Sequence, residues 1–390
     1  MAHSFVRDRF TWLAYLLLAF YGYFLNIFGP VTPFLKDELS LSYTVSSLHF
    51  TAFATGIILV GLVGHYPIRR LGRWRSLWIG AAGMGLGALL LLAGKTPLMT
   101  IVASFFMGLV GSLILAVVPS ALSDRHGEQR AVALSEANVI SSLVATAAPL
   151  MVGWFAHFAG SWRLALGIAA FIPILIRLGF GKAGIPETSP PWEDPARSGR
   201  KLPVLYWAFW VTIVLVVSVE FCMIYWSADY LESELGMLRV DAAQAVSLFL
   251  GAMIAGRLAG SRLVARFSPH KLVAASILLA SAGFLIYWKA GSVLPGVTGL
   301  FVTGLGVASL YPMTLALAIG SSRGNTVQAS ARATLASGSA ILALPLVLGR
   351  LADAAGIRQA FGVVALLLLF AFLMVQLTGR LSPARQPLAE

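Results

Sequence analysis

The sequence predicts an all-α membrane protein with twelve transmembrane helices, arranged as two six-helix halves with pseudo-symmetry. Three observations predict this fold. Hydrophobic residues make up 58% of the 390 residues and charged residues only 11%, whereas soluble domains carry roughly 25% charged residues. Apolar runs of membrane-spanning length recur along the chain. The second half also repeats the pattern of the first at a fixed distance.

Twelve apolar runs have the length of a transmembrane helix, which needs about 20 residues to cross roughly 30 Å of hydrocarbon. Backbone groups in lipid must be hydrogen-bonded within the protein, and these runs lack the alternation of membrane β-strands, so each is predicted to be a helix. In chain order the predicted spans are 10–35, 43–67, 76–94, 97–123, 131–158, 163–181, 203–231, 241–265, 272–290, 294–319, 328–352 and 357–379.

Basic residues predict the orientation of these spans. Most lysines and arginines outside the spans fall in loops on the side that holds both termini. The positive-inside rule therefore places both termini in the cytoplasm of a multi-pass protein of the cell inner membrane. The longest polar stretch contains four prolines and follows the sixth span, as a linker would. We predict an N-terminal half at 1–181, a cytoplasmic linker at 182–202 and a C-terminal half at 203–390.

An internal repeat is the strongest single feature of the sequence. A shift of 196 residues superposes the two halves without gaps and aligns glycines, prolines and a loop arginine. Two such halves in parallel register predict a pseudo-twofold axis along the membrane normal, with the solute site between them. The aligned pairs include Gly64 with Gly260, Arg70 with Arg266, Gly108 with Gly304, Pro149 with Pro345, and Gly153 with Gly349.

With these features the sequence resembles the major facilitator superfamily over essentially its full length. That family carries the signature Gly-x-x-x-Asp-Arg/Lys-x-Gly-Arg/Lys-Arg/Lys after its second helix. Here Arg70, Gly72 and Arg73 match, while Arg69 replaces the acidic residue and His65 the leading glycine. The resemblance implies transport by alternating access. The segment 304–312 is similar to fucose-permease-like carriers, which implies a sugar-like or other small polar solute.

Carboxylates inside predicted spans are the candidates for proton coupling, because a charged group within the bilayer is costly and usually functional. They are Glu220 and Asp229 in the seventh span and Glu136 in the fifth. A low-dielectric site disfavours the ionised carboxylate, as proton coupling requires. Glu220 and Asp229 share a face only loosely unless the helix is broken. The alternative for Glu220 is a structural hydrogen bond to a neighbouring helix.

Several arginines and one aspartate are candidates for gating charge pairs. The repeat aligns Glu136 with Arg332, and the family fold implies that Glu136 faces Arg257 of the eighth span while Arg332 faces the second span. The alternative is that these side chains reach the headgroups. Topology and solvated surface charge are the alternatives for the loop candidates, which are Arg70, Arg73, Asp124 and Arg130.

Polar and aromatic residues within the spans are candidates for solute binding. Asn138 and Ser142 lie on one face of the fifth helix, and helix packing by small residues is the alternative there. Tyrosine and tryptophan can stack on ring-shaped solutes, although many occupy interfacial belts instead. The candidates are Asn26, Tyr23, Asn138, Ser142, Tyr225, Trp226 and Tyr311.

These features predict a secondary active transporter that moves a small organic solute with proton coupling. A proton-driven multidrug exporter is the main alternative, and a membrane sensor or scaffold is a third. No phosphate-binding loop of an ATPase is present. The single cysteine, Cys222, argues against a disulfide framework or a cysteine metal cluster. We expect no enzyme activity, metal or cofactor, no nucleic-acid partner despite the net charge of +12, contact with membrane lipid, and a monomer.

Overall fold

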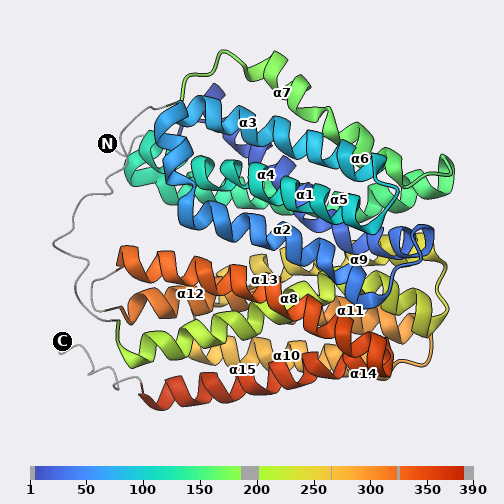
Figure 1. Ribbon diagram of the computed structural model, residues 1–390. Coiled ribbons are helices and arrows are strands. Elements are labelled where there is room, and N and C mark those ends of the chain that lie inside the picture. Colours follow the sequence, from blue (N-terminus) through green and yellow to red (C-terminus); the bar gives the residue numbers. More distant parts are fainter. Residues whose placement is uncertain (1–4, 186–201, 265, 323–325, 382–390) are drawn as a thin grey trace, which may run out of the picture.

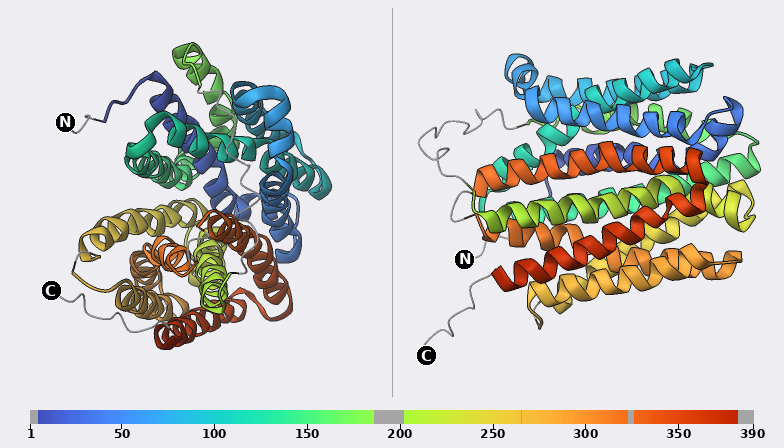
Figure 2. Two further views of the ribbon diagram at one scale, coloured as in Figure 1. Left: turned by 90° about the vertical axis from the view of Figure 1, so that its left-hand side faces the viewer. Right: turned by 60° about the horizontal axis from the view of Figure 1, so that its bottom comes forward.

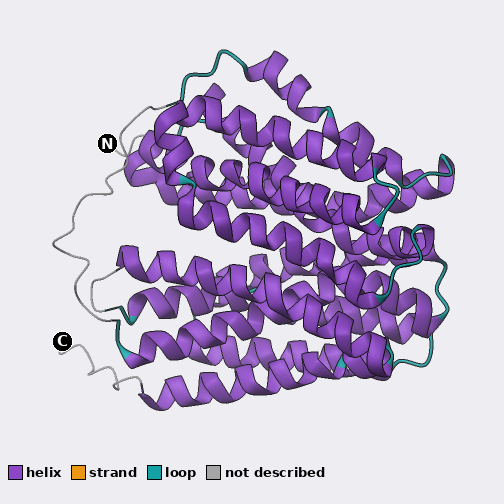
Figure 3. Ribbon diagram, in the orientation of Figure 1, coloured by secondary structure: helices purple, strands orange, loops and turns teal. Residues whose placement is uncertain are grey.

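The computed structural model describes residues 5–185, 202–264, 266–322 and 326–381, and every regular element in these ranges is a helix (Figure 3). Twelve helical stretches in the described part of the chain are long and apolar enough to cross a membrane. The predicted fold class, an all-α multi-pass membrane protein with twelve spans, is confirmed.

The first half contains six of these spans. The fourth continues into a short 3-10 turn, η1 (Gly127–Gln129), and the sixth consists of two short helices that meet at Phe171. The helices of this half are α1 (Arg9–Glu38), α2 (Tyr43–Val63), α3 (His65–Ala93), α4 (Pro97–His126), α5 (Arg130–Phe158), α6 (Arg163–Ala170) and α7 (Ile172–Phe180).

The second half contains the other six spans. The tenth span is interrupted at Ala308 and Ser309, and α8 runs without a break through the seventh span. The helices are α8 (Val204–Leu235), α9 (Arg239–Leu263), α10 (Pro269–Lys289), α11 (Val293–Val307), α12 (Leu310–Gly320), α13 (Thr326–Ala355), α14 (Ile357–Ala360) and α15 (Gly362–Leu381).

Several helices begin at residues that satisfy their free backbone N–H groups. The carboxylate of Asp8 accepts the backbone N–H of Thr11 at the start of α1, and Ser42 and Thr96 act in the same way at α2 and α4. At the other end, Gly236 ends α8 in the left-handed conformation, with φ of 65°. The capping residues fix where the loops begin.

The basic loop after the second span differs from the prediction in extent. The third span was predicted to begin at residue 76, but helix α3 begins at His65 and is interrupted at Gly72, whose φ of 79° and ψ of 159° are not helical. Only glycine adopts this conformation without strain. Gly72 therefore provides the turn between the basic segment and the membrane-spanning part of α3.

The two halves lie side by side, with all long helices roughly parallel (Figure 1). Viewed along the helices, they form two separate clusters (Figure 2). Helices α2 and α13 pack together across the boundary, as do α5 and α9, and α1 contacts both α8 and α9. This is the pairing of the fifth with the eighth span and the second with the eleventh that the family resemblance implied.

We call the side of the protein where α1 begins and α15 ends the terminal side. The opposite side is where α1 ends and α2 begins. Of the predicted linker 182–202, positions 186–201 lie outside the described residues. The domain boundaries at 181 and 203 stay predictions.

Candidate functional site

A carboxylate and a guanidinium meet in the middle of the protein, between the two halves. Glu220 is the seventeenth of the 32 residues of α8, which at 1.5 Å per residue puts it about 24 Å from the start of a helix about 48 Å long. Its Oε1 atom lies 3.9 Å from Nη2 of Arg257 in α9. Nη1 of Arg257 donates to the Ser142 hydroxyl of α5, at 3.1 Å. We call Glu220, Arg257 and Ser142 the central cluster.

The break in the tenth span supports this cluster. Because α11 ends at Val307 and α12 begins at Leu310, the carbonyl of Ala308 lies at the interruption, and it accepts a hydrogen bond from Nε of Arg257 at 3.2 Å. Ala308 keeps right-handed helical angles, but Pro312, four residues later, has no N–H to bond its carbonyl, which is therefore free to accept from the arginine. The interrupted helix thus orients the arginine toward Glu220 and α5.

Two aromatic candidates lie next to the central cluster. Tyr311, at the start of α12, lies beside Ser337 of α13 and close enough to Glu220 to interact electrostatically. Tyr225 also interacts with Glu220 and stacks on Phe50 of α2, with ring centroids 4.1 Å apart and planes 11° apart. Tyr225 therefore joins the two halves, although its side chain is fully buried.

Asn138 lies one helical turn from Ser142, toward the terminal side. Its amide donates to the carbonyl of Leu134 at 2.8 Å, and the residue is exposed. On the same helix, Ser142 faces α9, but the adjacent Ser141 donates to the carbonyl of Leu18 in α1. The polar residues of this part of α5 therefore serve two neighbouring helices, one in each half.

A second ion pair joins the halves near the opposite side. Lys36, in the last turn of α1, pairs with Asp229 of α8. The Asp229 side chain is 2% exposed, and its Oδ2 atom has no hydrogen-bond partner among the described residues. Nζ of Lys36 also lies 4.0 Å from the ring centroid of Tyr43. Asp229 and Glu220 are nine residues apart on an unbroken helix, so about 14 Å separates them.

Further polar contacts close the opposite side between the halves. The carboxylate of Asp353 in α13 accepts the backbone N–H groups of Tyr43 and Thr44, both at 2.8 Å, and so caps α2 from the other half. Arg239, at the start of α9, pairs with Asp37 of α1 at 3.0 Å and with Glu232 at 2.8 Å. Among the described residues, the hydrogen bonds and ion pairs that join the two halves lie at this end or near mid-depth.

The predicted pairing of Glu136 with Arg257 is wrong. Glu136 accepts two hydrogen bonds from the guanidinium of Arg7, at 2.6 and 2.8 Å, and a third from Tyr15 at 3.1 Å. All three residues belong to the first half, and the Glu136 side chain is 29% exposed near the terminal side. Arg7, in the segment before α1, pairs with this carboxylate, whereas Arg257 pairs with Glu220.

The other charged candidates form contacts within one half. Arg73 is buried and pairs with Asp124 of α4 at 2.6 Å. Arg70 and Arg130 are exposed on the terminal side. Arg332 was expected to face α2, but its guanidinium lies 6.0 Å from the Trp207 ring of α8, in its own half. The described contacts of these residues stabilise the separate halves and do not bridge them.

Three binding candidates are held by hydrogen bonds inside a half. The hydroxyl of Tyr23 donates to the carbonyl of Ala165, and the amide of Asn26 to the carbonyl of Gly22. The indole of Trp226 donates to the carbonyl of Pro345 at 3.1 Å and is fully buried. All three side chains are also buried, whereas Asn138 is exposed, so their predicted role in binding is not supported by their geometry.

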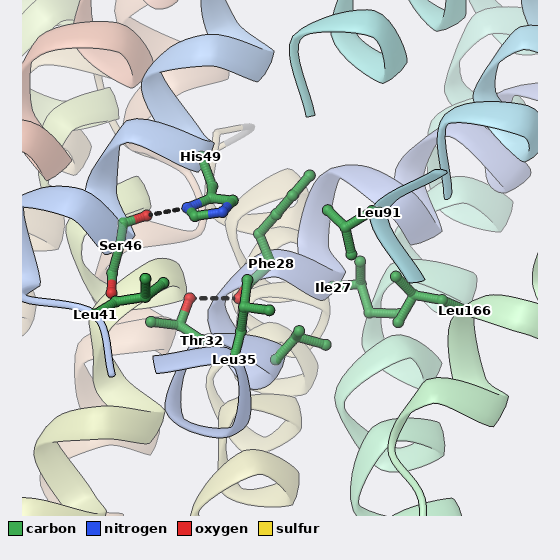
Figure 4. Close-up of a pocket in the computed structure, with 10 residues that line it drawn as sticks. Ile27, Phe28, Thr32, Leu35, Leu41, Ser46, His49, Leu91 and Leu166 are labelled. Carbon is green, nitrogen blue, oxygen red and sulfur yellow. Dashed lines mark hydrogen bonds between the residues drawn. The ribbon is translucent and has the colours of Figure 1, made fainter. Parts of the chain in front are cut away.

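A narrow pocket between α1, α2, α3 and α6 lies within the first half (Figure 4). Figure 4 shows His49 at its edge, with Nδ1 bonded to the Ser46 carbonyl at 3.1 Å. Its Nε2 lies 2.8 Å from the hydroxyl of Thr100. Both imidazole nitrogens are engaged and the rest of the lining is mostly apolar, so the pocket is separate from the central cluster.

Sequence reasoning missed the residues that close the opposite side. Lys36, Asp353 and Arg239 were not candidates because each lies near the end of a predicted span, where charge is unremarkable. One signal was available for Lys36. The repeat aligns it with Glu232, so the last turns of the first and seventh spans carry opposite charges.

Comparison with known proteins fixes the family. The sequence profile of the Major Facilitator Superfamily matches residues 14–293 and, in a second match, residues 209–389. The chain belongs to the major facilitator superfamily. It is therefore a multi-pass membrane transporter, as its fold and its repeat predicted.

Relatives of this superfamily member include proteins aligned over nearly the whole chain. A TsgA homolog of Erwinia tasmaniensis is 23% identical over 97% of this chain and 98% of that protein. A glucose/galactose transporter of Brucella abortus is 25% identical over 89% of this chain and 88% of that protein. An MFS-type transporter of Yersinia pestis is 31% identical, but the match spans only 38% of this chain and 39% of that protein.

Solved structures of the superfamily share the fold at low sequence identity. A bacterial homolog of the lysosomal transporter Spinster, in an inward-facing and occupied conformation, superposes with a TM-score of 0.78 at 16% identity, over 97% of this chain and 99% of that chain. A D-xylose-proton symporter gives a TM-score of 0.72 at 16% identity, over 94% and 96%. These likenesses confirm the two-half architecture.

Proposed function

We propose that this transporter carries a small, polar, sugar-like organic solute by alternating access, with uptake coupled to protons. The observation that carries the proposal is the central cluster. Glu220 and Arg257 are ionisable, lie at mid-depth, and face Ser142 from the other half. Ionisable residues at this depth are costly and mark solute or proton pathways.

Alternating access requires contacts that hold one side closed and can break. The Lys36–Asp229 pair and the Asp353 cap join the halves on the opposite side. A buried charge pair is favourable only while both partners are present, so separation of the halves there must provide the two charges with new partners or with water. That property suits a gate that opens and closes as a unit.

Glu220 is the proposed proton carrier. Its ion pair with Arg257 is long, at 3.9 Å, and its side chain is 16% exposed. An ionised carboxylate in a low-dielectric site needs a compensating charge, which either the arginine or a proton supplies. Glu220 can therefore exchange one for the other. Asp229 is the less suitable carrier, because Lys36 already pairs with it directly.

The named relatives support a sugar-like solute without identifying it. One aligned relative is named a glucose/galactose transporter, and one structure with the same fold is a D-xylose-proton symporter. Ser142 beside Arg257, Asn138 one helical turn from Ser142, and Tyr311 near Glu220 offer hydroxyl and amide groups, which suits a solute with several hydroxyl groups. We also propose that both termini face the cytoplasm of the inner membrane, from the distribution of lysine and arginine.

Flux into proteoliposomes tests the proposal. The purified protein is reconstituted, and uptake of radiolabelled sugars, sugar acids and other small polar solutes is followed with an inward proton gradient and without one. We expect accumulation only with the gradient, and loss of accumulation in Glu220→Gln. Glu128→Gln is the matched control, because Glu128 is an exposed carboxylate on the terminal side.

The outcomes separate the proposal from its alternatives. Accumulation that ignores the proton gradient contradicts proton coupling, as does full coupling in Glu220→Gln. Transport of lipophilic cations alone, driven outward by the gradient, would replace the proposal with a drug exporter. Solute counterflow that persists in Glu220→Gln while accumulation is lost would support Glu220 as the proton carrier, because exchange of solute needs no net proton movement.

A further inference from the structure

The guanidinium of Arg257 is only partly hydrogen-bonded by the described residues. An arginine has five N–H donors, and the described residues accept two of them, through the Ala308 carbonyl and the Ser142 hydroxyl. Glu220 is 3.9 Å away, which is an electrostatic contact but too long for a hydrogen bond. The side chain is also 39% exposed. Most of its N–H donors therefore remain open to a ligand.

Glu220 is the only acidic neighbour of Arg257 among the described residues. On α5, the nearest carboxylate toward the terminal side is Glu136, which is engaged by Arg7. On α8, Asp229 pairs with Lys36 about 14 Å from Glu220. Among the described residues, Glu220 is therefore the one carboxylate that can neutralise the Arg257 guanidinium.

The groups that face Glu220 are equally few. Arg257 comes from α9, Tyr225 from α8 itself and Tyr311 from α12. On α1, Tyr21 interacts with Tyr225, and on α13 the neutral hydroxyl of Ser337 lies beside Tyr311. Among the described residues of α11, α14 and α15, the packing neighbours that remain, no charged group interacts with Glu220. The cluster holds one negative and one positive charge.

We propose that Arg257 binds the carboxylate of an organic-acid solute, such as a sugar acid, after a proton on Glu220 has released the arginine. This inference rests on the proposed function and specifies its substrate class. Arginine matches a carboxylate through two parallel N–H···O bonds, and its open donors are arranged for that contact. Ser142 and Asn138, which lie one helical turn apart on α5, can then hydrogen-bond the hydroxyl groups of the same solute.

The charge balance of the cluster follows from this exchange. With Glu220 ionised and the site empty, the two charges cancel. Protonation of Glu220 leaves one positive charge, and the solute carboxylate cancels it again. A second anion at an ionised Glu220 would leave a net negative charge in a low-dielectric site, which is unfavourable. One proton therefore accompanies each monovalent acid, and the loaded transporter moves no net charge. A neutral sugar carried with a proton would instead move one positive charge.

Binding is tested by thermal stabilisation of the purified, full-length protein. The probes are gluconate and galacturonate, with glucose and galactose as their neutral counterparts, each at pH 5.5 and pH 8. We expect the acids to raise the melting temperature at pH 5.5. The apparent Kd obtained by titrating this shift should be at least tenfold higher at pH 8. Glu220→Gln, which mimics the protonated carboxyl, should bind them equally at both pH values. Arg257→Gln should abolish their effect, whereas the control Arg262→Gln, an exposed arginine on the same helix, should retain it.

The wild-type protein provides a test that needs no variant. In proteoliposomes, the membrane potential is set by potassium and valinomycin while the pH gradient is held constant. Uptake of the acid should change less than twofold between 0 and −120 mV, and without the pH gradient the acid should no longer accumulate above its external concentration. Uptake that rises with the potential overturns the inference, as does stabilisation by acids that survives Arg257→Gln.

Failure of this inference is distinguishable from failure of the proposed function. If neutral sugars alone stabilise the protein and accumulate with a proton gradient, the proton-coupled transporter stands and the organic-acid site is refuted. If an acid binds through Arg257 but its transport ignores the pH gradient, proton coupling is refuted, together with the role of Glu220 as proton carrier.

Discussion

Replacement of Lys36 tests how the two halves are held together on the opposite side. Lys36→Met keeps most of the apolar length of the side chain and removes its charge. Asp229 would then be left 2% exposed, without its ion-pair partner and with Oδ2 still lacking a hydrogen bond from any described residue. The closed arrangement would contain an uncompensated buried charge, which an open arrangement can expose to water.

The expected magnitude follows from the burial of the two partners. Removal of one member of a buried pair costs about 3–5 kcal/mol. Lys36→Met should lie at the upper end of this range because Asp229 cannot reach solvent. Asp229→Asn should lie at the lower end, because the flexible lysine is 22% exposed and keeps its contact with the Tyr43 ring. Each 1.36 kcal/mol changes an equilibrium constant tenfold. A cost of about 4 kcal/mol therefore lowers the ratio of closed to open protein about a thousandfold.

Distances between spin labels measure this shift. Lys95 and Leu238 are exposed positions on the opposite side, one in each half, and each can be replaced by cysteine. Because Cys222 is the single native cysteine and is buried, Cys222→Ala provides a clean background. Lys36→Met should broaden and lengthen the distance distribution. The double variant Lys36→Met/Asp229→Asn should return toward the parent, since it leaves no charge unpaired.

Two results would refute this reasoning. An unchanged distance distribution in Lys36→Met would mean that the ion pair does not hold the opposite side closed. A double variant as open as Lys36→Met would mean that the lost attraction, and not the unpaired carboxylate, dominates the energetics.

Two further predictions concern the terminal side. Asp8 is partly buried, which raises its pKa, but the hydrogen bonds from Thr11 and the ion pair with Arg125 outweigh burial, so the pKa lies below its ordinary value. The ionised carboxylate therefore stabilises the folded protein above about pH 4. This stabilisation is lost as the pH falls through the lowered pKa. Asp8→Ala should cost about 1 kcal/mol at pH 7, and its difference in melting temperature from wild type should shrink below pH 4. Gly72→Ala should lower the free energy of unfolding by about 1–3 kcal/mol, because φ at this position is 79°. Gly179→Ala is the control and should change the melting temperature little, because no atom lies within 4 Å of the new Cβ. Equal effects of the two substitutions would contradict the strain argument.

The sequence predicted the spans well because hydropathy is a local property. Most predicted boundaries fall within a few residues of the helices, and the largest departure is at α3, where the basic segment before Gly72 is itself helical. Apolar content identifies a membrane-crossing stretch, but it does not tell a helical loop from a non-helical one. The interruption at Ala308 and Ser309 comes just before Pro312, which has no N–H to bond the Ala308 carbonyl four residues earlier.

The candidate residues were only partly predictable. Glu220, Arg257 and Ser142 were all singled out from the sequence, and the structure brings them together. Their pairing was assigned incorrectly, because the family fold sets the fifth span against the eighth and so suggested Arg257 as the partner of Glu136. Equivalent positions in two halves share a depth in the membrane, but they need not share a partner.

The sequence by itself determined twelve spans, two related halves and the family, because bilayer thickness and the low dielectric constant of lipid act on each segment separately. Only the tertiary structure decided which charges meet: Lys36 with Asp229, Arg257 with Glu220, and Arg7 with Glu136. Ion pairs depend on distances of a few ångströms between helices, and those distances are set by how the helices pack around one another. The charge pairs on which the transport proposal rests are therefore a product of packing that no single segment specifies.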